Sequence, residues 1–392
     1  MIESYMLHIG VVVHSLNHNN IGRVYPFLQA FVGSGVACCT LIGGDAGGEL
    51  FPLLTDLPWP VVRLRPGAMS ARALGEALRD CDVVHCFKNR EHLSATVAAA
   101  QSLGIPLILD LDDWELGLYL EGVARWPAWR RAISGGPITA RIRAELAREQ
   151  VARTAPAALT VNSRALQGHY GGRIVYTAAD AAAFAPGHAD GQQFRQTHGI
   201  PADAPLIGFL GTPHPHKGID ELLAAFVQLQ THQPQARLLF AGVPAHNQDA
   251  ARLRALSGVL TTGYLAAHEY PAAYAACDII AIPQRAVTEG VMQTPAKLIL
   301  AMAAGRPIVA TTVGDMPQIL AGTGVLVPPE DAAALASALL SLLGDPTRRS
   351  ALGVAARERF LANYTTVHLR DQLLDIYRSC SAKRALDRQA MS

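Results

Sequence analysis

Residues 285–318 form the segment of this sequence with the clearest chemical potential. The stretch RAVTEGVMQTPAKLILAMAAGRPIVATTVGDMPQ opens as a loop, continues into a predicted helix at 297–304 that Gly305 ends, and leads to an apolar strand at 307–310. A helix N-terminus presents unpaired backbone N–H groups and the positive end of the helix dipole, so it suits an anion such as a diphosphate. Lys297, on the first turn, adds a full positive charge. An ordinary βαβ crossover without a ligand would show the same pattern, and that alternative stays open.

A second loop of this kind begins the second half of the chain, in IGFLGTPHPHKGIDELLAAF. Gly211 and Thr212 follow a predicted strand, and Lys217 leads into a predicted helix. His214 and His216 flank the loop and could donate hydrogen bonds to phosphate oxygens. Taken alone, these residues would be a solvated lysine and two surface histidines on a turn. Two lysine-bearing loops at the ends of nearby strands favour one shared anion site.

Three aspartates, Asp110, Asp112 and Asp113, form a close acidic group at the end of a predicted strand in the first half. A carboxylate at the carboxyl end of a strand could orient an acceptor or take its proton. Asp113 could instead cap the next helix while the other two are solvated, and an aspartate group could also hold Mg²⁺. Of these alternatives we favour a site role for Asp112.

Tryptophan and arginine are concentrated in residues 114–131. The segment contains Trp114, Trp126, Trp129, Arg125, Arg130 and Arg131. Such a face can stack on sugar rings or rest on an anionic membrane surface. We predict an insertion that recognises the acceptor or acts as a lid. Its partner could be a membrane surface, in peripheral contact, or a lipid-linked acceptor. His18, in a polar loop after the first strand, is a further acceptor-side candidate, although a plain turn would look similar.

Short apolar runs, each followed by a helical pattern, must position these residues. Runs without strict alternation fit parallel strands that are buried on both faces. Their repeated β-then-α order predicts an α/β fold of two Rossmann-like, doubly wound domains facing across a cleft, with ligands at the carboxyl ends of the strands. The predicted strands lie at 9–14, 36–42, 61–64, 83–86, 107–111, 158–161, 206–210, 236–241, 259–261, 279–282, 308–310 and 325–327.

The domain boundaries are predicted from length and composition. A chain of 392 residues exceeds the size of one ordinary core. Around residue 184 the composition shifts to Gly, Pro, Asp and Gln, as in a linker. We predict an acceptor-side domain at 1–183, a linker at 184–204, a donor-binding domain at 205–360, and C-terminal helices at 361–392 that pack back on the first domain.

Composition also argues against several classes of protein. The net charge is +1 with no block of like charge, which argues against a nucleic-acid partner. The N-terminus lacks the basic region of a signal peptide, and no apolar run reaches membrane-spanning length. The six cysteines show no metal-binding spacing and fit a reduced cytosol. We therefore expect a cytoplasmic protein without a metal or cofactor; its oligomeric state is not indicated.

The order of motifs in the second half resembles a known family. GTPHPHKGIDELLAAF, LLFAGV, TTGYLAAHEYPAAYAACDIIAIP, TPAKLILAMAAGRPIVATTVGDMPQIL and GVLVPPEDAAALASALLSLL follow one another as in the retaining glycosyltransferases of family 4, which have the GT-B fold. The resemblance covers residues 206–377. It is looser in the first half, where DVVHCF, PLILDLDDWE and VNSRALQGHYGG run in register.

The resemblance implies a nucleotide-sugar donor on the second domain and an acceptor on the first, with a UDP-sugar favoured as the commonest donor. Lys217 and Lys297 would neutralise the leaving diphosphate. Gly263 and Tyr264 would lie in the loop that meets the nucleobase. Thr294 belongs to the same motif as Lys297.

For the first domain, the resemblance places Asp112 beside the reacting sugar and Gly22 near the donor phosphates. Such enzymes retain the anomeric configuration without a clear enzymic nucleophile and commonly need no metal. Catalysis would then depend on positioning and on charge stabilisation of the leaving group.

Some positions depart from the family pattern. Leu300 stands where the family usually has a glutamate that grips sugar or ribose hydroxyls, and Glu289 is the nearest carboxylate that could replace it. Thr212 replaces a frequent arginine, and Gln318 a common glutamate. A catalytically silent GT-B partner subunit, or a GT-B enzyme of other chemistry such as an epimerase or phosphorylase, is therefore the alternative. The two retained lysines argue against a silent subunit.

Overall fold

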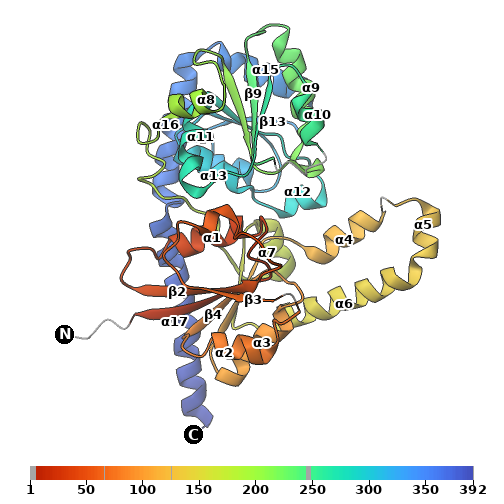
Figure 1. Ribbon diagram of the computed structural model, residues 1–392, viewed down its shortest axis with the longest axis vertical. Coiled ribbons are helices and arrows are strands. Elements are labelled where there is room, and N and C mark those ends of the chain that lie inside the picture. The colour runs from red at the N-terminus through yellow and green to blue at the C-terminus, as the bar shows by residue number, and fades with distance from the viewer. Residues whose placement is uncertain (1–5, 66, 125, 244–248, 392) are drawn as a thin grey trace. The chain divides into compact units, whose positions relative to one another are not determined.

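The computed structural model describes residues 6–65, 67–124, 126–243 and 249–391, with the side chains of 131–133 and 382–391 not described. The chain divides into two compact units. Unit 1 comprises Met1–Tyr176 and Leu369–Ser392, and unit 2 comprises Thr177–His368. Each unit is built on its own parallel sheet with helices packed around it (Figure 1).

The described residues of unit 1 form a sheet of seven parallel strands in the order β3-β2-β1-β4-β5-β6-β7. The strands are β1 (Leu7–Val13), β2 (Ala37–Gly44), β3 (Val61–Leu64), β4 (Val83–Phe87), β5 (Leu107–Leu111), β6 (Ala158–Val161) and β7 (Arg173–Ile174). The helices are α1 (Ile21–Gln29), η1 (Pro52–Leu54), α2 (Ala71–Ala77), α3 (Leu93–Leu103), α4 (Glu115–Ala124), α5 (Ala128–Ile133), α6 (Gly135–Thr154) and α7 (Arg164–Tyr170).

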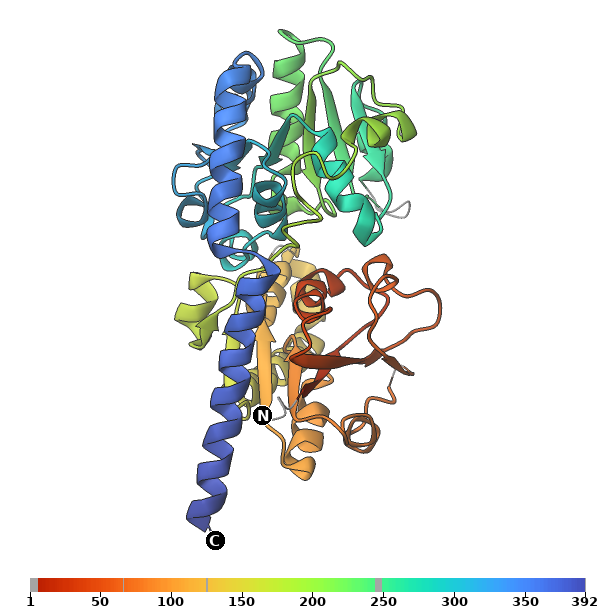
Figure 2. The same cartoon turned by 90° about the vertical axis from the view of Figure 1, so that its left-hand side faces the viewer.

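The sheet of unit 1 forms around apolar strands that are buried on both faces. Every residue of β4 and β5 is buried, as expected for central parallel strands. The C-terminal helix α17 (Thr366–Met391) completes this unit from Leu369 onward, and Figure 2 shows it running along one side of the sheet. The Tyr377 hydroxyl lies 2.7 Å from Nδ1 of His85 on β4, so a buried polar contact fixes the helix on the sheet.

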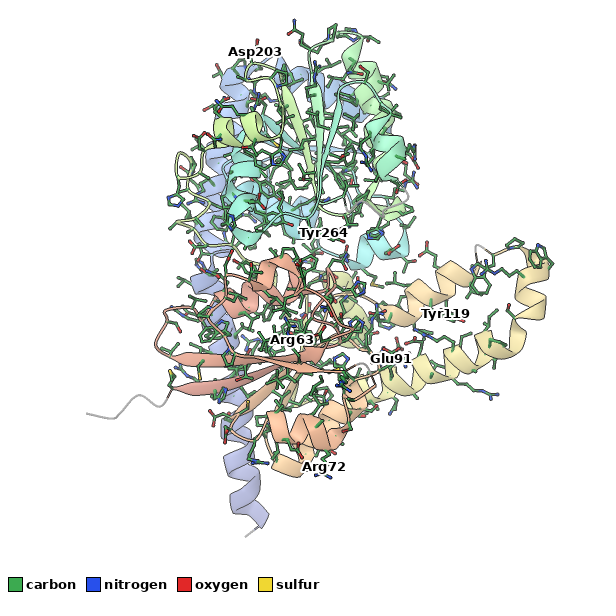
Figure 3. The ribbon with its side chains drawn as sticks, viewed as in Figure 1. Arg63, Arg72, Glu91, Tyr119, Asp203 and Tyr264 are labelled. Atoms are coloured by element: carbon green, nitrogen blue, oxygen red, sulfur yellow. The ribbon has the colours of Figure 1, made fainter. Side chains whose placement is uncertain are left out.

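Helices α4, α5 and α6 form an arm that projects from the sheet of unit 1 (Figure 1). Only Glu145, Glu149 and Ala152 are buried in the twenty-residue helix α6. On the arm, Arg141 lies 5.6 Å from the ring centroid of Tyr119, which Figure 3 marks on α4. The predicted insertion is therefore a helical arm with very little apolar core of its own.

Unit 2 contains six parallel strands in the order β10-β9-β8-β11-β12-β13. The strands are β8 (Leu206–Leu210), β9 (Arg237–Ala241), β10 (Val259–Thr262), β11 (Ile279–Ile282), β12 (Ile308–Thr311) and β13 (Val325–Val327). The helices are α8 (Gly191–Thr197), η2 (Pro215–Lys217), α9 (Ile219–Gln230), α10 (Ala250–Arg254), η3 (Ala267–Glu269), α11 (Tyr270–Ala276), α12 (Thr288–Met292), α13 (Ala296–Ala303), α14 (Met316–Leu320), α15 (Ala332–Leu343) and α16 (Pro346–Asn363).

Helices cover both faces of the unit 2 sheet (Figure 1). Helices α9 and α15 pack together on one face, and their apolar residues join those of β8, β9 and β11 in one buried cluster. On the other face α8 packs on α11, and α13 packs on α16. Helices thus cover both faces of the sheet, and the loops that could bind a ligand lie at the ends of its strands.

All twelve predicted strands are present, with ends that agree within two residues. The two-residue strand β7 was not predicted, because it is too short to give an apolar run. The expected helix at 297–304 is α13, one residue earlier, and the loop before it contains the additional short helix α12.

The predicted linker at 184–204 is instead a packed part of unit 2. Asp190 caps α8 by accepting hydrogen bonds from two backbone N–H groups. The buried Arg195 guanidinium on α8 donates to the carbonyl of Ala276 and to the carboxylate of Asp278. The Gly, Pro and Asp residues that suggested a flexible linker therefore serve as caps and turns of a docked helix.

The C-terminal boundary also differs from the prediction of 361–392. Helix α16 packs on α13, and Arg357 on α16 donates to the carbonyl of Ala303, so α16 belongs to unit 2. Thr366 N donates to the carbonyl of Ala179, also within unit 2. The chain joins unit 1 only from Leu369, because helical periodicity alone does not show which sheet an amphipathic helix covers.

Candidate functional site

The strand order of unit 2 places two loops where the chain changes direction within the sheet. β8 lies between β9 and β11. In doubly wound sheets the carboxyl ends of the strands at such a switch point form the ligand-binding crevice. The loop after β8 carries Gly211 and Lys217, and the loop after β11 leads through α12 to Lys297 on α13. Both predicted lysines therefore come from loops at the switch point.

Lys297 is buried, with 7% of its surface exposed. Its Nζ lies 3.2 Å from the ring centroid of Phe209 on β8. A methyl group on Gly211 would lie 3.6 Å from the same Nζ, so the ammonium is beside the backbone of the loop after β8. Among the described residues, Nζ of Lys297 has no hydrogen-bond partner. A buried cationic group that lacks a protein partner is a strong indication of an anionic ligand.

The charge balance around Lys297 is unfavourable for an ammonium. Burial lowers its pKa well below the usual value, and the nearby charge of Lys217 lowers it further. Lys217 Nζ donates to the carbonyl of Thr212 at 2.8 Å, which fixes the second amine in the same loop. The two lysines are therefore close enough to interact electrostatically; that they act on one ligand stays a prediction.

Gly218 holds the Lys217 loop against the end of β11. It has a left-handed backbone (φ 71°), and a Cβ there would lie 1.8 Å from the carbonyl oxygen of Pro283. Only glycine fits this approach. The loop after β8 and the loop after β11 are therefore in direct contact at the switch point.

His214 and His216 lie in the same loop with their rings stacked, 5.7 Å between centroids. His216 is buried, and its Nδ1 lies 3.1 Å from a carboxylate oxygen of Glu289 on α12. His214 is more exposed. Its partial burial and the charge of Lys217 lower its pKa to about 4. The structure thus brings both histidines and Glu289 to the predicted anion site, with Glu289 engaged by His216.

Thr294 lies just before α13 and is also buried. Its Oγ1 has no hydrogen-bond partner among the described residues. The nearby Gln284 amide donates to the carbonyls of Gly290 and Gln293 and so holds this loop in shape. A second unpartnered polar group therefore lies close in sequence to Lys297, on a loop that is internally braced.

Gly263 and Tyr264 follow β10 at the same edge of the sheet. Gly263 is exposed, and its carbonyl accepts a hydrogen bond from Gly242 N at 3.1 Å. Tyr264 is half-buried, and Figure 3 marks it at the end of the sheet. Since β10 is two strands from β8, these residues lie about 10 Å from the loop after β8.

Unit 1 has its own switch point, between β1 and β4. The buried Asp110 carboxylate accepts two hydrogen bonds from the Arg23 guanidinium, at 2.9 and 2.8 Å, and one from the Thr160 hydroxyl at 2.6 Å. Asp110 is therefore part of the internal bracing of unit 1. Of the three predicted aspartates, Asp112 and Asp113 remain at the strand end.

Asp112 and Asp113 form ion pairs with Lys88, which follows β4 and was not predicted from the sequence. Lys88 Nζ lies 2.9 Å from Oδ1 of Asp112. Burial alone would lower the pKa of Lys88, but the two carboxylates outweigh it and raise this pKa above its usual value. Burial raises the pKa of Asp112, and Lys88 opposes that rise.

Several buried polar atoms at the strand ends of unit 1 lack hydrogen-bond partners within the described residues. They include Nδ1 of His14 after β1, both polar side-chain atoms of Asn89 after β4 and Oδ1 of Asn162 after β6. The two asparagines are 2% and 5% exposed. The register pairs Leu111 with Val161, so Asp112 and Asn162 follow opposite positions on neighbouring strands. Sequence reasoning missed the asparagines because a single polar residue after a strand is a common turn signal.

Gly22 and His18 come from the loop after β1. His18 is exposed, and Gly22 is the second residue of α1. A methyl group on Gly22 would meet nothing within 4 Å, so packing does not require glycine there. The structure places both residues at the switch-point end of unit 1 without a direct role for either.

The tryptophans of the arm have different environments. Trp114 Nε1 donates to the Glu149 carboxylate at 2.8 Å, so this ring is tied to α6. The Arg130 guanidinium lies 4.1 Å from the ring centroid of Trp126, and Trp129 is 66% exposed. Arg125 and the side chain of Arg131 lie outside the described part of the chain.

No group of three or more His, Cys, Asp or Glu side chains within 6–65, 67–124, 126–243 and 249–391 is arranged to hold a metal ion. Likewise, none of the helices in these ranges combines the length and apolar character needed to cross a bilayer.

The fold and the strand-end sites define a protein of two Rossmann-like units, one of which places the buried Lys297 and the half-buried Lys217 at its switch point. Residues 204–345 match the sequence family described as "Glycosyl transferases group 1". D-inositol 3-phosphate glycosyltransferase 1 of Catenulispora acidiphila is 31% identical over 341 residues, which cover 79% of this chain and 76% of the relative. The chain therefore belongs to the group 1 glycosyl transferases, family 4 of the glycosyltransferases.

Other relatives match over a shorter part. D-inositol 3-phosphate glycosyltransferase of Stackebrandtia nassauensis is 31% identical over 222 residues, 53% of this chain and 48% of the relative, so the match spans about half of that protein. Among solved structures, Anabaena HepE in complex with UDP-glucose superposes with a TM-score of 0.74 at 19% identity, over 95% of this chain and 100% of that one. This likeness shows the GT-B fold.

Proposed function

We propose that this protein transfers a sugar from a nucleotide-sugar donor, with a UDP-sugar favoured, to an acceptor with retention of configuration. The observation that carries the proposal is the buried Lys297 Nζ, which has no hydrogen-bond partner among the described residues and lies near a second lysine. A diphosphate supplies the missing negative charge. Family membership supports the reaction class, and HepE, solved with UDP-glucose, supports the donor class.

The chemistry of unit 2 would be stabilisation of the leaving group. When the bond between the sugar and the diphosphate breaks, negative charge grows on the phosphate oxygen. Lys217 and Lys297 would meet that charge, and at the buried Lys297 an electrostatic interaction is stronger than in water. The unpartnered Thr294 hydroxyl could add a hydrogen bond. Gly263 and Tyr264, about 10 Å away along the same sheet edge, would contact the nucleoside.

The acceptor is proposed to bind the strand ends of unit 1. Asn89 and Asn162 offer amide donors and acceptors, and Asp112, held by Lys88, offers a carboxylate to orient a hydroxyl. Such a mixture suits a polyhydroxylated acceptor, because every hydroxyl both donates and accepts. The names of the two relatives, which refer to D-inositol 3-phosphate, support an acceptor of this kind.

Contact with a membrane or a lipid-linked acceptor remains a prediction for the arm. The exposed Trp129 and the Arg130–Trp126 pair support it, since aromatic and cationic side chains suit the surface of an anionic bilayer. The cytoplasmic location and the independence from metal ions also remain predictions.

One observation favours the silent-subunit alternative. Leu300 lies one turn beyond Lys297 on α13 and cannot accept a hydrogen bond from a donor hydroxyl. Glu289, the replacement considered from the sequence, lies against His216. A silent subunit could still bind a nucleotide, so binding and transfer must be measured separately.

The test is a thermal-shift screen with UDP, GDP and ADP and their sugars. A nucleotide at 100 times its Kd should stabilise the protein by about 2.7 kcal/mol. Lys217→Ala should weaken that stabilisation, whereas Arg348→Ala should not, because Arg348 is an exposed cation on α16 of the same unit. If no nucleotide raises the Tm, the proposal is wrong. If a nucleotide binds but its sugar is neither transferred nor hydrolysed, the silent subunit is the better description.

A further inference from the structure

The amine of Lys297 is surrounded by apolar or positively charged groups. The aromatic ring of Phe209 lies 3.2 Å below Nζ, and Gly211 borders it with backbone. Lys217 is the charged group that acts on it most directly. No side chain within hydrogen-bond reach, among the described residues, stabilises the ammonium.

In the described part of the chain, the elements packed around α13 place no carboxylate beside Lys297; Glu358 on α16 is exposed. Strands β8, β11 and β12 carry the sequences LIGFL, IIAI and IVAT, which contain no ionisable side chain. On α16, Arg357 contacts the other end of α13, at Ala303. Of the remaining groups in the site, His214 is a base, and the Glu289 carboxylate lies on His216.

From this geometry we propose that binding of the donor diphosphate is coupled to the uptake of one proton by Lys297. The amine is neutral before the nucleotide binds and is an ammonium in the complex. The proton comes from solvent and adds to the lone pair of Nζ; no covalent bond of the ligand changes, and the proton returns to solvent when the nucleotide leaves. The inference rests on the proposed function, since it needs a diphosphate in this site.

The physical reason is the cost of burying an unpaired charge. An isolated ammonium in an apolar site shifts its pKa and becomes neutral. The lowered pKa of Lys297, caused first by burial and then by Lys217, agrees with this behaviour. Phosphate oxygens beside Nζ would provide the partner, and the ammonium would then be favoured. Lys217 differs because it already donates to the Thr212 carbonyl.

Proton uptake has a functional consequence. The affinity for the diphosphate should rise as the pH falls, by up to tenfold per pH unit, between the pKa of Lys297 in the free protein and its pKa in the complex. Release of the nucleoside diphosphate product should be easier when the proton is lost. The lysine would thus be charged only while there is a charge to stabilise.

Titration calorimetry on the full chain tests the coupling. UDP, or whichever of UDP, GDP and ADP binds, is titrated at pH 8 in two buffers of different ionisation enthalpy. At this pH the terminal phosphate, with a second pKa of about 6, is already ionised, so the ligand itself takes up little proton. The difference in measured heat then gives the number of protons bound, and we expect close to one proton per nucleotide.

The matched variants are Lys297→Arg and Lys217→Arg. A guanidinium stays charged, so Lys297→Arg should bind nucleotide without proton uptake, whereas Lys217→Arg should keep it. Lys297→Met, which suits a buried apolar site, serves if arginine does not fit, and it should bind more weakly with no uptake. Equal uptake in the Lys297 variants and the native protein, or none in the native protein, overturns the inference while leaving the proposed function intact. Failure of every nucleotide to bind overturns both.

A spectroscopic readout follows from the sequence. The chain has four lysines, Lys88, Lys217, Lys297 and Lys383, so protein labelled with [15N]lysine gives few side-chain amine signals. The Lys297 signal, assigned by its loss in Lys297→Met, should show a neutral amine at pH 8 without nucleotide and an ammonium with it. A Lys297 signal that is an ammonium in both states would contradict the proposal.

Discussion

Lys88 in unit 1 and Lys297 in unit 2 occupy comparable places in two similar folds. Each follows a central parallel strand at a switch point, Lys88 directly and Lys297 through a loop. The protein gives Lys88 two carboxylate partners, Asp112 and Asp113, and its pKa is raised. It gives Lys297 a phenylalanine ring and a second lysine, and its pKa is lowered.

This difference indicates which chemical groups of a ligand each strand-end site suits. In unit 1 Lys88 is paired with two carboxylates, and the buried atoms without hydrogen-bond partners in the described part of the chain include both polar side-chain atoms of Asn89 and Oδ1 of Asn162. In unit 2, the amine of Lys297 has no hydrogen-bond partner among the described residues. We infer that the first site suits the hydroxyl groups of an acceptor and that the second suits an anion.

The first prediction concerns stability and should give the largest effect. Lys88→Met should lower the free energy of unfolding by about 3–5 kcal/mol, because it leaves two largely buried carboxylates without a partner. Lys297→Met should not destabilise the nucleotide-free protein, because it removes an unpartnered amine and keeps an apolar stem over Phe209. Urea denaturation of both variants measures the contrast.

The double variant Lys88→Met, Asp113→Asn is the control. It should recover part of the loss, since one of the two unpaired carboxylates becomes neutral. Equal destabilisation by the two single variants would mean that Lys297 has an internal partner, and the comparison between the units would fail.

The fold was predictable because its signal is local. Apolar runs such as LILDL and LIGFL define central strands by themselves. That Lys217 and Lys297 follow strands and lie at the starts of helices was also predictable, because a helix N-terminus with a basic residue is a short-range pattern. Neither required knowledge of the strand order.

Charge compensation was not predictable, because it depends on the side chains that the sheet brings together. Lys88 lies 24 residues before Asp112, and only the pairing of β4 with β5 makes them neighbours. Asp110 and Asp112 looked equivalent in the sequence, yet only the structure shows that Arg23, on α1, donates a hydrogen bond to Asp110. The prediction of a linker at 184–204 was wrong for the same reason: the helix in this segment is held by Asp278, which is distant in the sequence.

The second prediction concerns activity. Lys297→Ala should lower kcat/KM for sugar transfer by about 10²–10³, because a positioned donor to a developing negative charge is worth about 2.7–4 kcal/mol. A transfer assay with the nucleotide sugar identified by the thermal-shift screen measures it.

The fall should appear mainly in kcat if Lys297 acts on the leaving group, since that charge is fully developed only in the transition state. Arg348→Ala is the matched loss of an exposed cation and should leave kcat/KM unchanged. Full activity of Lys297→Ala would refute the phosphate assignment.

The third prediction concerns acid. Burial lowers the pKa of His85 in unit 1 to about 4, from a model-peptide value near 6.5. Below pH 6.5 the unfolded chain gains a proton that the folded protein does not, so stability is lost as the pH falls toward 4. The slope should be up to about 1.4 kcal/mol per pH unit for this histidine. Urea denaturation at several pH values between 4 and 7 measures it.

His85→Gln should make that stability curve flatter while keeping a polar contact to the Tyr377 hydroxyl. His188→Gln is the control, because His188 is exposed on unit 2. Nucleotide should leave the His85 contribution unchanged, which separates the internally balanced core of unit 1 from the ligand-dependent charge of unit 2. Parallel curves for His85→Gln and the native protein would contradict the prediction.

The smallest expected effect tests whether Glu289 replaces the sugar-gripping glutamate missing at Leu300. Its carboxylate lies 3.1 Å from His216 Nδ1, and it is an acidic group in a site built around two lysines. Glu289→Gln should therefore strengthen UDP binding about two- to threefold at low salt, equivalent to about 0.5 kcal/mol for a partly exposed charge. Calorimetry with UDP and with the UDP-sugar separates the two roles. If Glu289 binds the sugar, the variant loses affinity for the UDP-sugar but not for UDP. Unit 2 would then also contribute a carboxylate to its site, and the two units would differ only in how the lysine at the phosphate site is compensated.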